Sequence, residues 1–142
     1  MTALVTAPAF AQPALTCPAL PTSAGLHWEQ QTHDAFVVCK GIGEDGRAVL
    51  NIMLSPRDPD LVLVRSFRAE PGSYAGEDLH WYKIDNGNAR QGEELRRITV
   101  VKVDKRQYAQ IWINANDANE LTRMQALTAT LGTDATLTAG RR

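Results

Sequence analysis

Between residues 26 and 115 the chain is a succession of short apolar stretches separated by turn-forming residues. Stretches of this length, rich in β-branched and aromatic residues, are typical of β-strands joined by hairpins. From Ala48 to Leu54, for example, the even positions are all apolar and lie on one face of a strand, because strand side chains alternate. The pattern predicts strands at 26–31, 35–42, 47–55, 61–68, 79–85, 95–105 and 106–115.

Turn chemistry divides these stretches. Residues 32–34 and the sequence GEDG at 43–46 predict tight turns between the first three strands, and Asn86-Gly87 favours a hairpin turn. Two prolines in 56–60 cannot donate to a ladder and predict a surface loop. We expect 69–78 to be a ten-residue connection. The last two strands form a hairpin around 104–106, and their β-branched runs suit the centre of a sheet.

One helix follows the strands. Asp117 and Glu120 have the spacing of a capping box, which marks a helix N-terminus. Gly132 favours a left-handed conformation that ends the helix. The apolar stripe between these points is expected to lie across the sheet, and it comprises Leu121, Met124, Leu127, Thr128 and Leu131.

The elements together predict an α+β fold, with an antiparallel β-sheet of about six or seven strands, built from a meander and hairpins, and one C-terminal α-helix packed on it. A closed small β-barrel is the alternative. The 142 residues suffice for one core. We therefore expect a signal-peptide remnant at 1–11 and a single globular domain at 12–142.

The expected signal remnant rests on the triplet Ala9-Phe10-Ala11, whose small residues suit a cleavage site after Ala11. Residues 1–10 contain no Lys or Arg, and Pro8 interrupts the apolar stretch. The stretch is thus interpreted as the tail of an export signal. An untargeted Ala/Pro/Thr leader on a cytoplasmic protein is the alternative.

The sequence contains two cysteines, Cys17 and Cys39. An even count in an exported chain is most simply explained by one disulfide, and we expect it to join the leader to a strand. Two buried free thiols are the alternative if the leader is not a signal. Acylation of Cys17, as in a lipoprotein, is disfavoured by Thr16 before it and Pro18 after it.

The charge balance disfavours nucleic acids and anionic membrane surfaces as partners. Fifteen basic and sixteen acidic side chains nearly cancel, so the chain offers no field that would attract a nucleic acid. The sequence contains no run of 18 apolar residues, so it predicts no membrane-spanning helix.

Motifs of catalysis and cofactor binding are missing from the sequence. There is no G-x-S-x-G, no H-E-x-x-H and no phosphate-binding glycine loop, and the two cysteines do not form a C-x-x-C pair. His27, His33 and His80 lack metal-ligand spacing. We expect no catalytic residues, no metal and no cofactor.

The segment 65–83 is the candidate partner-binding region, because Arg, Tyr and Trp are enriched at the energetic centres of protein interfaces. Trp81 and Phe67 are alternatively core residues. The predicted partner-binding residues are Arg68, Glu70, Ser73, Tyr74, Glu77, Asp78, His80 and Tyr82.

These observations favour an exported, periplasmic or secreted binding protein without catalysis. The most concrete hypothesis is an inhibitor or immunity protein that blocks a secreted toxin or lysozyme-like enzyme, with a loop around Tyr74 entering the target's cleft. A structural or assembly component of the bacterial envelope or its secretion machinery is the first alternative, and a small hydrolase the second. We expect a monomer or a weak homo-oligomer.

Overall fold

The computed structural model describes residues 15–84 and 95–132, which form seven strands, one α-helix and two short 3₁₀ segments. The expected signal remnant and the turn at Asn86-Gly87 lie outside the described residues. The elements are η1 (Thr22–Ala24), β1 (Leu26–Thr32), β2 (Val37–Gly43), β3 (Ala48–Ser55), η2 (Arg65–Phe67), β4 (Arg68–Tyr74), β5 (Glu77–Lys83), β6 (Arg96–Asp104), β7 (Gln107–Asn114) and α1 (Ala118–Thr130).

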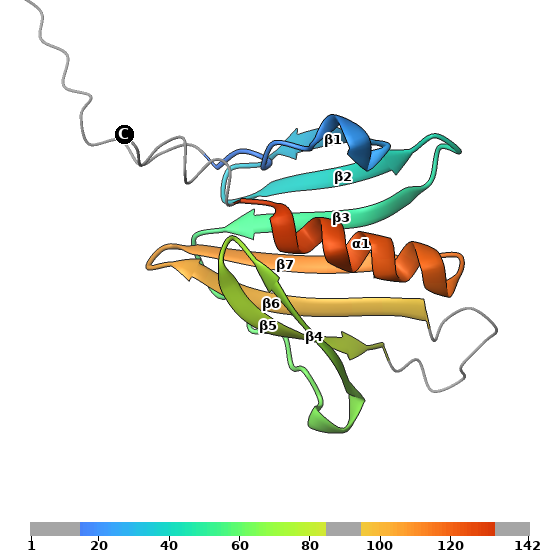
Figure 1. Ribbon diagram of the computed structural model, residues 1–142. Helices are drawn as coiled ribbons and strands as arrows, with labels where there is room; N and C mark the ends of the chain where they lie inside the picture. The colour runs from blue at the N-terminus through green and yellow to red at the C-terminus, as the bar shows by residue number, and fades with distance from the viewer. Residues whose placement is uncertain (1–14, 85–94, 133–142) are drawn as a thin grey trace, which may run out of the picture.

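The strands form one antiparallel sheet in the order β1-β2-β3-β7-β6-β5-β4 (Figure 1). The sheet is open, with β1 and β4 at its edges, so the α+β prediction is confirmed and the barrel alternative is wrong. The β6–β7 hairpin turns at 105–106 and β7 lies at the centre, as the β-branched runs predicted.

The hydrophobic core lies between the sheet and α1. Alternation places Leu50, Ile52 and Leu54 of β3 opposite Ile113, Ile111 and Ala109 of β7, and all six are buried. We call this side of the sheet the helix face, since α1 lies in front of it in Figure 1, and the opposite side the helix-free face.

Helix α1 begins and ends as predicted. Asp117 accepts a hydrogen bond from the Glu120 backbone N–H at 2.8 Å, which satisfies one of the free donors of the first turn. The Glu120 carboxylate accepts from the Asn116 N–H, one residue before the cap. Leu121 and Met124 are buried against the sheet, and Gly132 has a φ of 81°.

The hairpin of β4 and β5 corrects two predictions. Residues 61–64 are not a strand, and 69–78 is not a long loop, because β4 starts at Arg68 and runs to Tyr74. A two-residue turn at Ala75-Gly76 leads directly into β5. Both turn residues have positive φ, 52° and 82°, the backbone geometry that matches the twist of a tight hairpin.

The β4–β5 hairpin curls away from the sheet toward the end of α1 (Figure 1). Within the described residues, the β5–β6 ladder has two pairs, Tyr82 with Ile98 and Lys83 with Arg97. At the hairpin tip the Ala75 N–H donates to the Leu131 carbonyl at 3.0 Å. The hairpin therefore packs the C-terminal end of α1 against the sheet.

The predicted disulfide is present between Cys17 and Cys39, with Cα atoms 5.8 Å apart. It holds the leader, residues 15–24, over β1 and β2. The Trp28 indole N–H donates to the Pro18 carbonyl at 2.7 Å, and Leu15 and Leu20 pack against the core. A disulfide fits an oxidising compartment, extracellular or periplasmic.

Candidate functional site

The eight predicted partner-binding residues all lie on β4 and β5, but they divide between the two faces. Cross-strand pairs share a face, and Arg68 pairs with Tyr82 while Ser73 pairs with Asp78. A β-bulge between Arg68 and Pro71 adds one residue to β4, after which Pro71 lies opposite His80. Five of the predicted residues therefore lie on the helix-free face of the hairpin, and we call them the outer β4–β5 surface: Arg68, Ser73, Asp78, His80 and Tyr82.

The outer β4–β5 surface continues across the sheet. Tyr82 lies opposite Ile98 of β6, and Ile98 lies opposite Trp112 of β7. The result is a row of one arginine, two aromatic residues and one isoleucine over four adjacent strands, in which Arg68 is exposed and the other three are half-buried. Sequence reasoning missed Ile98 and Trp112, because only the register brings them beside Tyr82.

The remaining predicted residues do not belong to this surface. Tyr74 is buried on the helix face, where desolvation raises the pKa of its hydroxyl to about 12. Glu70 accepts two hydrogen bonds from Arg97 and one from Gln125 of α1, which is also on the helix face. Glu77 is exposed opposite Tyr74, next to the turn. The prediction of a projecting loop around Tyr74 is therefore wrong.

A hydrolase site on this hairpin would need Tyr74, Glu77, Asp78 and His80 around one cavity. The structure separates them, because Tyr74 lies on the helix face and Asp78 and His80 lie on the other. Among residues 15–84 and 95–132, no three His, Cys, Asp or Glu side chains gather closely enough to hold a metal ion. Trp81 is fully buried, which confirms the alternative interpretation that it is a core residue.

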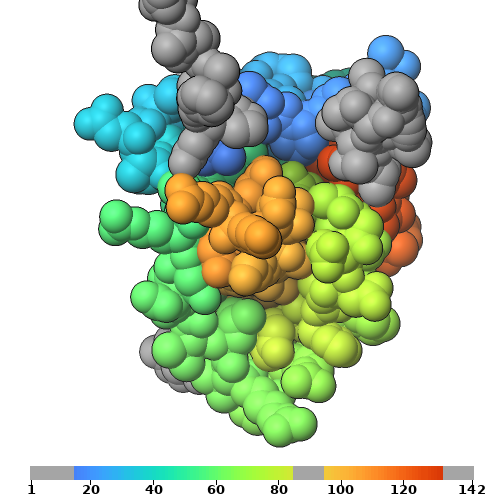
Figure 2. All heavy atoms as spheres, turned by 90° about the vertical axis from the view of Figure 1, so that its left-hand side faces the viewer, coloured from blue at the N-terminus to red at the C-terminus, as the bar shows by residue number. Residues whose placement is uncertain are grey.

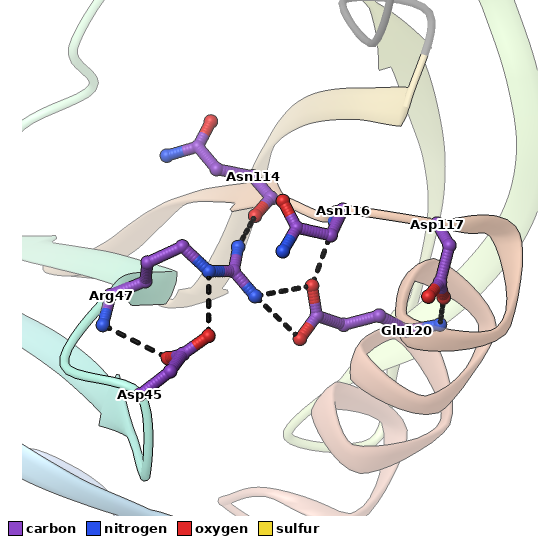
Figure 3. A network of polar contacts seen from close by, with 6 residues as sticks. All are labelled: Asp45, Arg47, Asn114, Asn116, Asp117 and Glu120. Atoms are coloured by element: carbon purple, nitrogen blue, oxygen red, sulfur yellow. Dashed lines mark hydrogen bonds and ion pairs between the residues drawn. The ribbon is translucent and has the colours of Figure 1, made fainter.

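A second polar cluster lies at the N-terminus of α1 (Figure 3). The Arg47 guanidinium lies 2.8 Å from both Glu120 oxygens and 2.9 Å from Asp45 Oδ2, and it donates to the Asn114 carbonyl at 3.2 Å. The Arg47 backbone N–H also donates to Asp45, and these bonds together lower the pKa of the Asp45 carboxyl. The sequence predicted Glu120 as a capping acid but gave no signal for its partner 73 residues away.

This cluster borders a cleft of about 320 Å³ between the β2–β3 turn, the start of β1 and α1. Its apolar floor includes Leu26, Val49 and Met124. Three acidic residues line the cleft, Glu44, Asp45 and Glu120, and Arg47 engages the last two. The cluster therefore ties the β2–β3 turn to α1, and its charges are used within the fold rather than directed at a ligand.

A third feature was absent from the sequence reasoning. Leu61, Val62 and Val64 are exposed in the connection between β3 and β4. Figure 2 shows this green segment on the side of the molecule away from the red helix. The sequence predicted a strand at 61–68, and its apolar run does not indicate that the valines are exposed.

The described residues contain no helix of the length and apolarity needed to cross a membrane. Comparisons with protein-family models, with curated proteins and with solved structures find no match to this chain.

Proposed function

We propose that this chain is an exported binding protein that acts on another protein without catalysis. The observation that carries the proposal is the row of Arg68, Tyr82, Ile98 and Trp112 across the helix-free face. Arginine, tyrosine and tryptophan are the residue types that dominate the binding energy of protein interfaces. The Cys17–Cys39 disulfide supports a site of action outside the cytosol.

In its most concrete form, the chain is an inhibitor or immunity protein for a cell-wall-degrading or other envelope-acting enzyme. The mechanism is steric: the outer β4–β5 surface covers the mouth of the enzyme's cleft. Exposed Arg68 and Asp78 offer charges of both signs to the rim of the target. A surface held by strands binds as a preformed unit, since its backbone does not have to be ordered on association.

The test is inhibition of peptidoglycan hydrolysis by lysozyme-like enzymes and by any toxic enzyme encoded beside this chain. We expect the purified protein to slow hydrolysis, and Arg68→Ala or Tyr82→Ala to weaken inhibition at least about tenfold, as for a central interface residue. Glu29→Ala is the matched control, because Glu29 lies on the helix-free face at the opposite edge of the sheet.

Two results would overturn the proposal. One is unchanged hydrolysis with every enzyme, together with stabilisation of the protein by a small molecule. The other is inhibition that Arg68→Ala and Tyr82→Ala leave intact. Thermal unfolding of each variant shows that a loss of inhibition does not come from a loss of folding.

An assembly component of the envelope or its secretion machinery is the second candidate. The exposed apolar residues between β3 and β4 favour it, since contiguous exposed apolar side chains mark interaction sites.

A further inference from the structure

The helix face of the sheet is covered by two separate pieces of the chain. The leader, held by the Cys17–Cys39 disulfide, lies over β1 and β2, and α1 lies in front of the central strands (Figure 1). Neither piece fills the space beside the β2–β3 turn, and the cleft of about 320 Å³ lies there. Cavities of this volume are at the lower end of the range of small-molecule sites. The cleft therefore has the size for a small molecule.

The floor of the cleft is apolar. Val49 and Met124 are each 2% exposed, and half-buried Leu26 lines the cleft with them. Gly43 also lines the cleft, and its lack of a side chain contributes to the open space, since a Cβ at this position would approach no atom closer than 3.4 Å. An apolar group of a ligand that lies on this floor is removed from water, which favours binding.

Two charged side chains of the lining make no ion pair or hydrogen bond within the described part of the chain. They are Glu44 of the β2–β3 turn and Arg123 of α1, and both are exposed. Glu120 lies three residues before Arg123, a spacing at which opposite charges pair on a helix, but Arg47 binds both of its oxygens. Arg47 likewise binds Asp45, the neighbour of Glu44. The internal network therefore leaves one anion and one cation of the cleft available to a ligand.

We propose that this cleft binds a small zwitterion with an apolar side chain, the chemistry shared by apolar α-amino acids and short peptides. The ammonium group of the ligand pairs with Glu44, its carboxylate pairs with Arg123, and its side chain lies on the apolar floor. Because the two charges come from different walls of the cleft, a ligand that carries both charges joins the β2–β3 turn to α1. This inference does not rest on the proposed function, because the outer β4–β5 surface is a separate set of residues.

Isothermal titration calorimetry with two probes, L-leucine and the dipeptide L-alanyl-L-leucine, tests the site and separates a free amino acid from a peptide. We expect the better of the two to bind with a dissociation constant on the order of 0.1–1 mM, because ion pairs with exposed side chains are weak. Its N-acetyl and amide derivatives, which lack the ammonium and the carboxylate, should each bind about three- to fivefold more weakly. Replacing its leucine by glycine removes the apolar side chain and should weaken binding at least about tenfold.

Variants of the two charged residues assign each end of the ligand. Arg123→Gln should bind the zwitterion and its amide equally well, because no cation then selects the carboxylate, and it should still disfavour the N-acetyl derivative. Glu44→Gln should lose the preference against the N-acetyl derivative and keep the preference against the amide. Glu29→Gln and Arg106→Gln are the matched controls, since both residues are exposed and lie outside the cleft, and they should keep both preferences.

Gly43→Val narrows the cleft without changing either charge and should weaken binding of the zwitterion at least about tenfold, and thermal unfolding checks that the variant is folded. Three results would overturn the proposal: no binding of either probe up to about 10 mM, preferences that Glu44→Gln and Arg123→Gln both retain, or binding that Gly43→Val leaves intact. Failure of enzyme inhibition leaves the cleft proposal standing, because inhibition is assigned to the outer β4–β5 surface.

Discussion

Arg97 of β6 and Glu70 of β4 form a bidentate ion pair, although β5 separates their strands in the sheet. Arg97 Nε and Nη2 lie 2.9 Å and 2.8 Å from the two Glu70 oxygens. The β4 bulge directs Glu70 to the helix face, and the curl of the hairpin brings it over to β6. Gln125 of α1 donates to the same carboxylate, so one acid joins two strands and the helix.

Glu70→Gln should lower the free energy of unfolding by about 1–3 kcal/mol. The Arg97 side chain is only 6% exposed, and loss of a counter-charge is costly for a buried cation, but Glu70 is 41% exposed and solvent screens part of the effect. Urea denaturation measures the change. Glu77→Gln, an exposed acid of the same hairpin, should change stability by less than about 0.5 kcal/mol; equal effects of the two variants would contradict the role of the pair.

The same ion pair predicts a pH dependence. Hydrogen bonds from Arg97 lower the pKa of Glu70 from 4.5 to about 2. A carboxyl with a depressed pKa contributes stability above its unfolded value and loses it as pH falls through the folded one. The stability difference between wild type and Glu70→Gln should therefore be constant above pH 4.5 and shrink toward pH 2. A difference that stays constant down to pH 2 would show that the negative charge of Glu70 does not contribute to its stabilising interaction with Arg97.

Local rules predicted most of the fold. Three such features act over a few residues or through a fixed covalent geometry. They are the alternation from Ala48 to Leu54, the spacing of Asp117 and Glu120, and the two cysteines. They correctly gave β3, the start of α1 and the disulfide. The start of β4 was missed because Pro71 and Gly72 disfavour a strand interior. An edge strand tolerates a proline, and β4 is an edge strand.

The candidate site was predicted in part. Arg68 and Tyr82 were selected by residue type, and they share the helix-free face with His80. The inclusion of Glu70 and Tyr74 failed for a physical reason: a single inserted residue reverses the side on which every later side chain of a strand lies. The β4 bulge is such an insertion, and the residues between Arg68 and Pro71 do not mark its position.

Gly72→Ala should destabilise the protein by about 1–3 kcal/mol, the usual cost of overpacking a core. A Cβ on Gly72 would lie 2.6 Å from Trp81 Nε1, and Trp81 is fully buried, so the indole has no room to move aside. Gly43→Ala is the control, because its Cβ would approach no atom closer than 3.4 Å. Thermal unfolding of both variants measures the difference; equal stabilities would show that β4 shifts away from Trp81 without cost.

Removing the Cys17–Cys39 disulfide should lower the free energy of unfolding by about 3 kcal/mol. The two cysteines are 22 residues apart, and a cross-link of this span restricts the unfolded chain by about that amount in the chain-entropy model. The double variant Cys17→Ser/Cys39→Ser should therefore unfold at lower urea than the oxidised wild type, and dithiothreitol should lower the wild type to the same level without affecting the variant. Limited proteolysis should then cut first within residues 15–24, because only noncovalent contacts would hold the leader, among them the hydrogen bond from Trp28 to Pro18 and the packing of Leu15 and Leu20. A variant as stable as the oxidised wild type would mean that these contacts, and not the covalent link, hold the leader on β1 and β2.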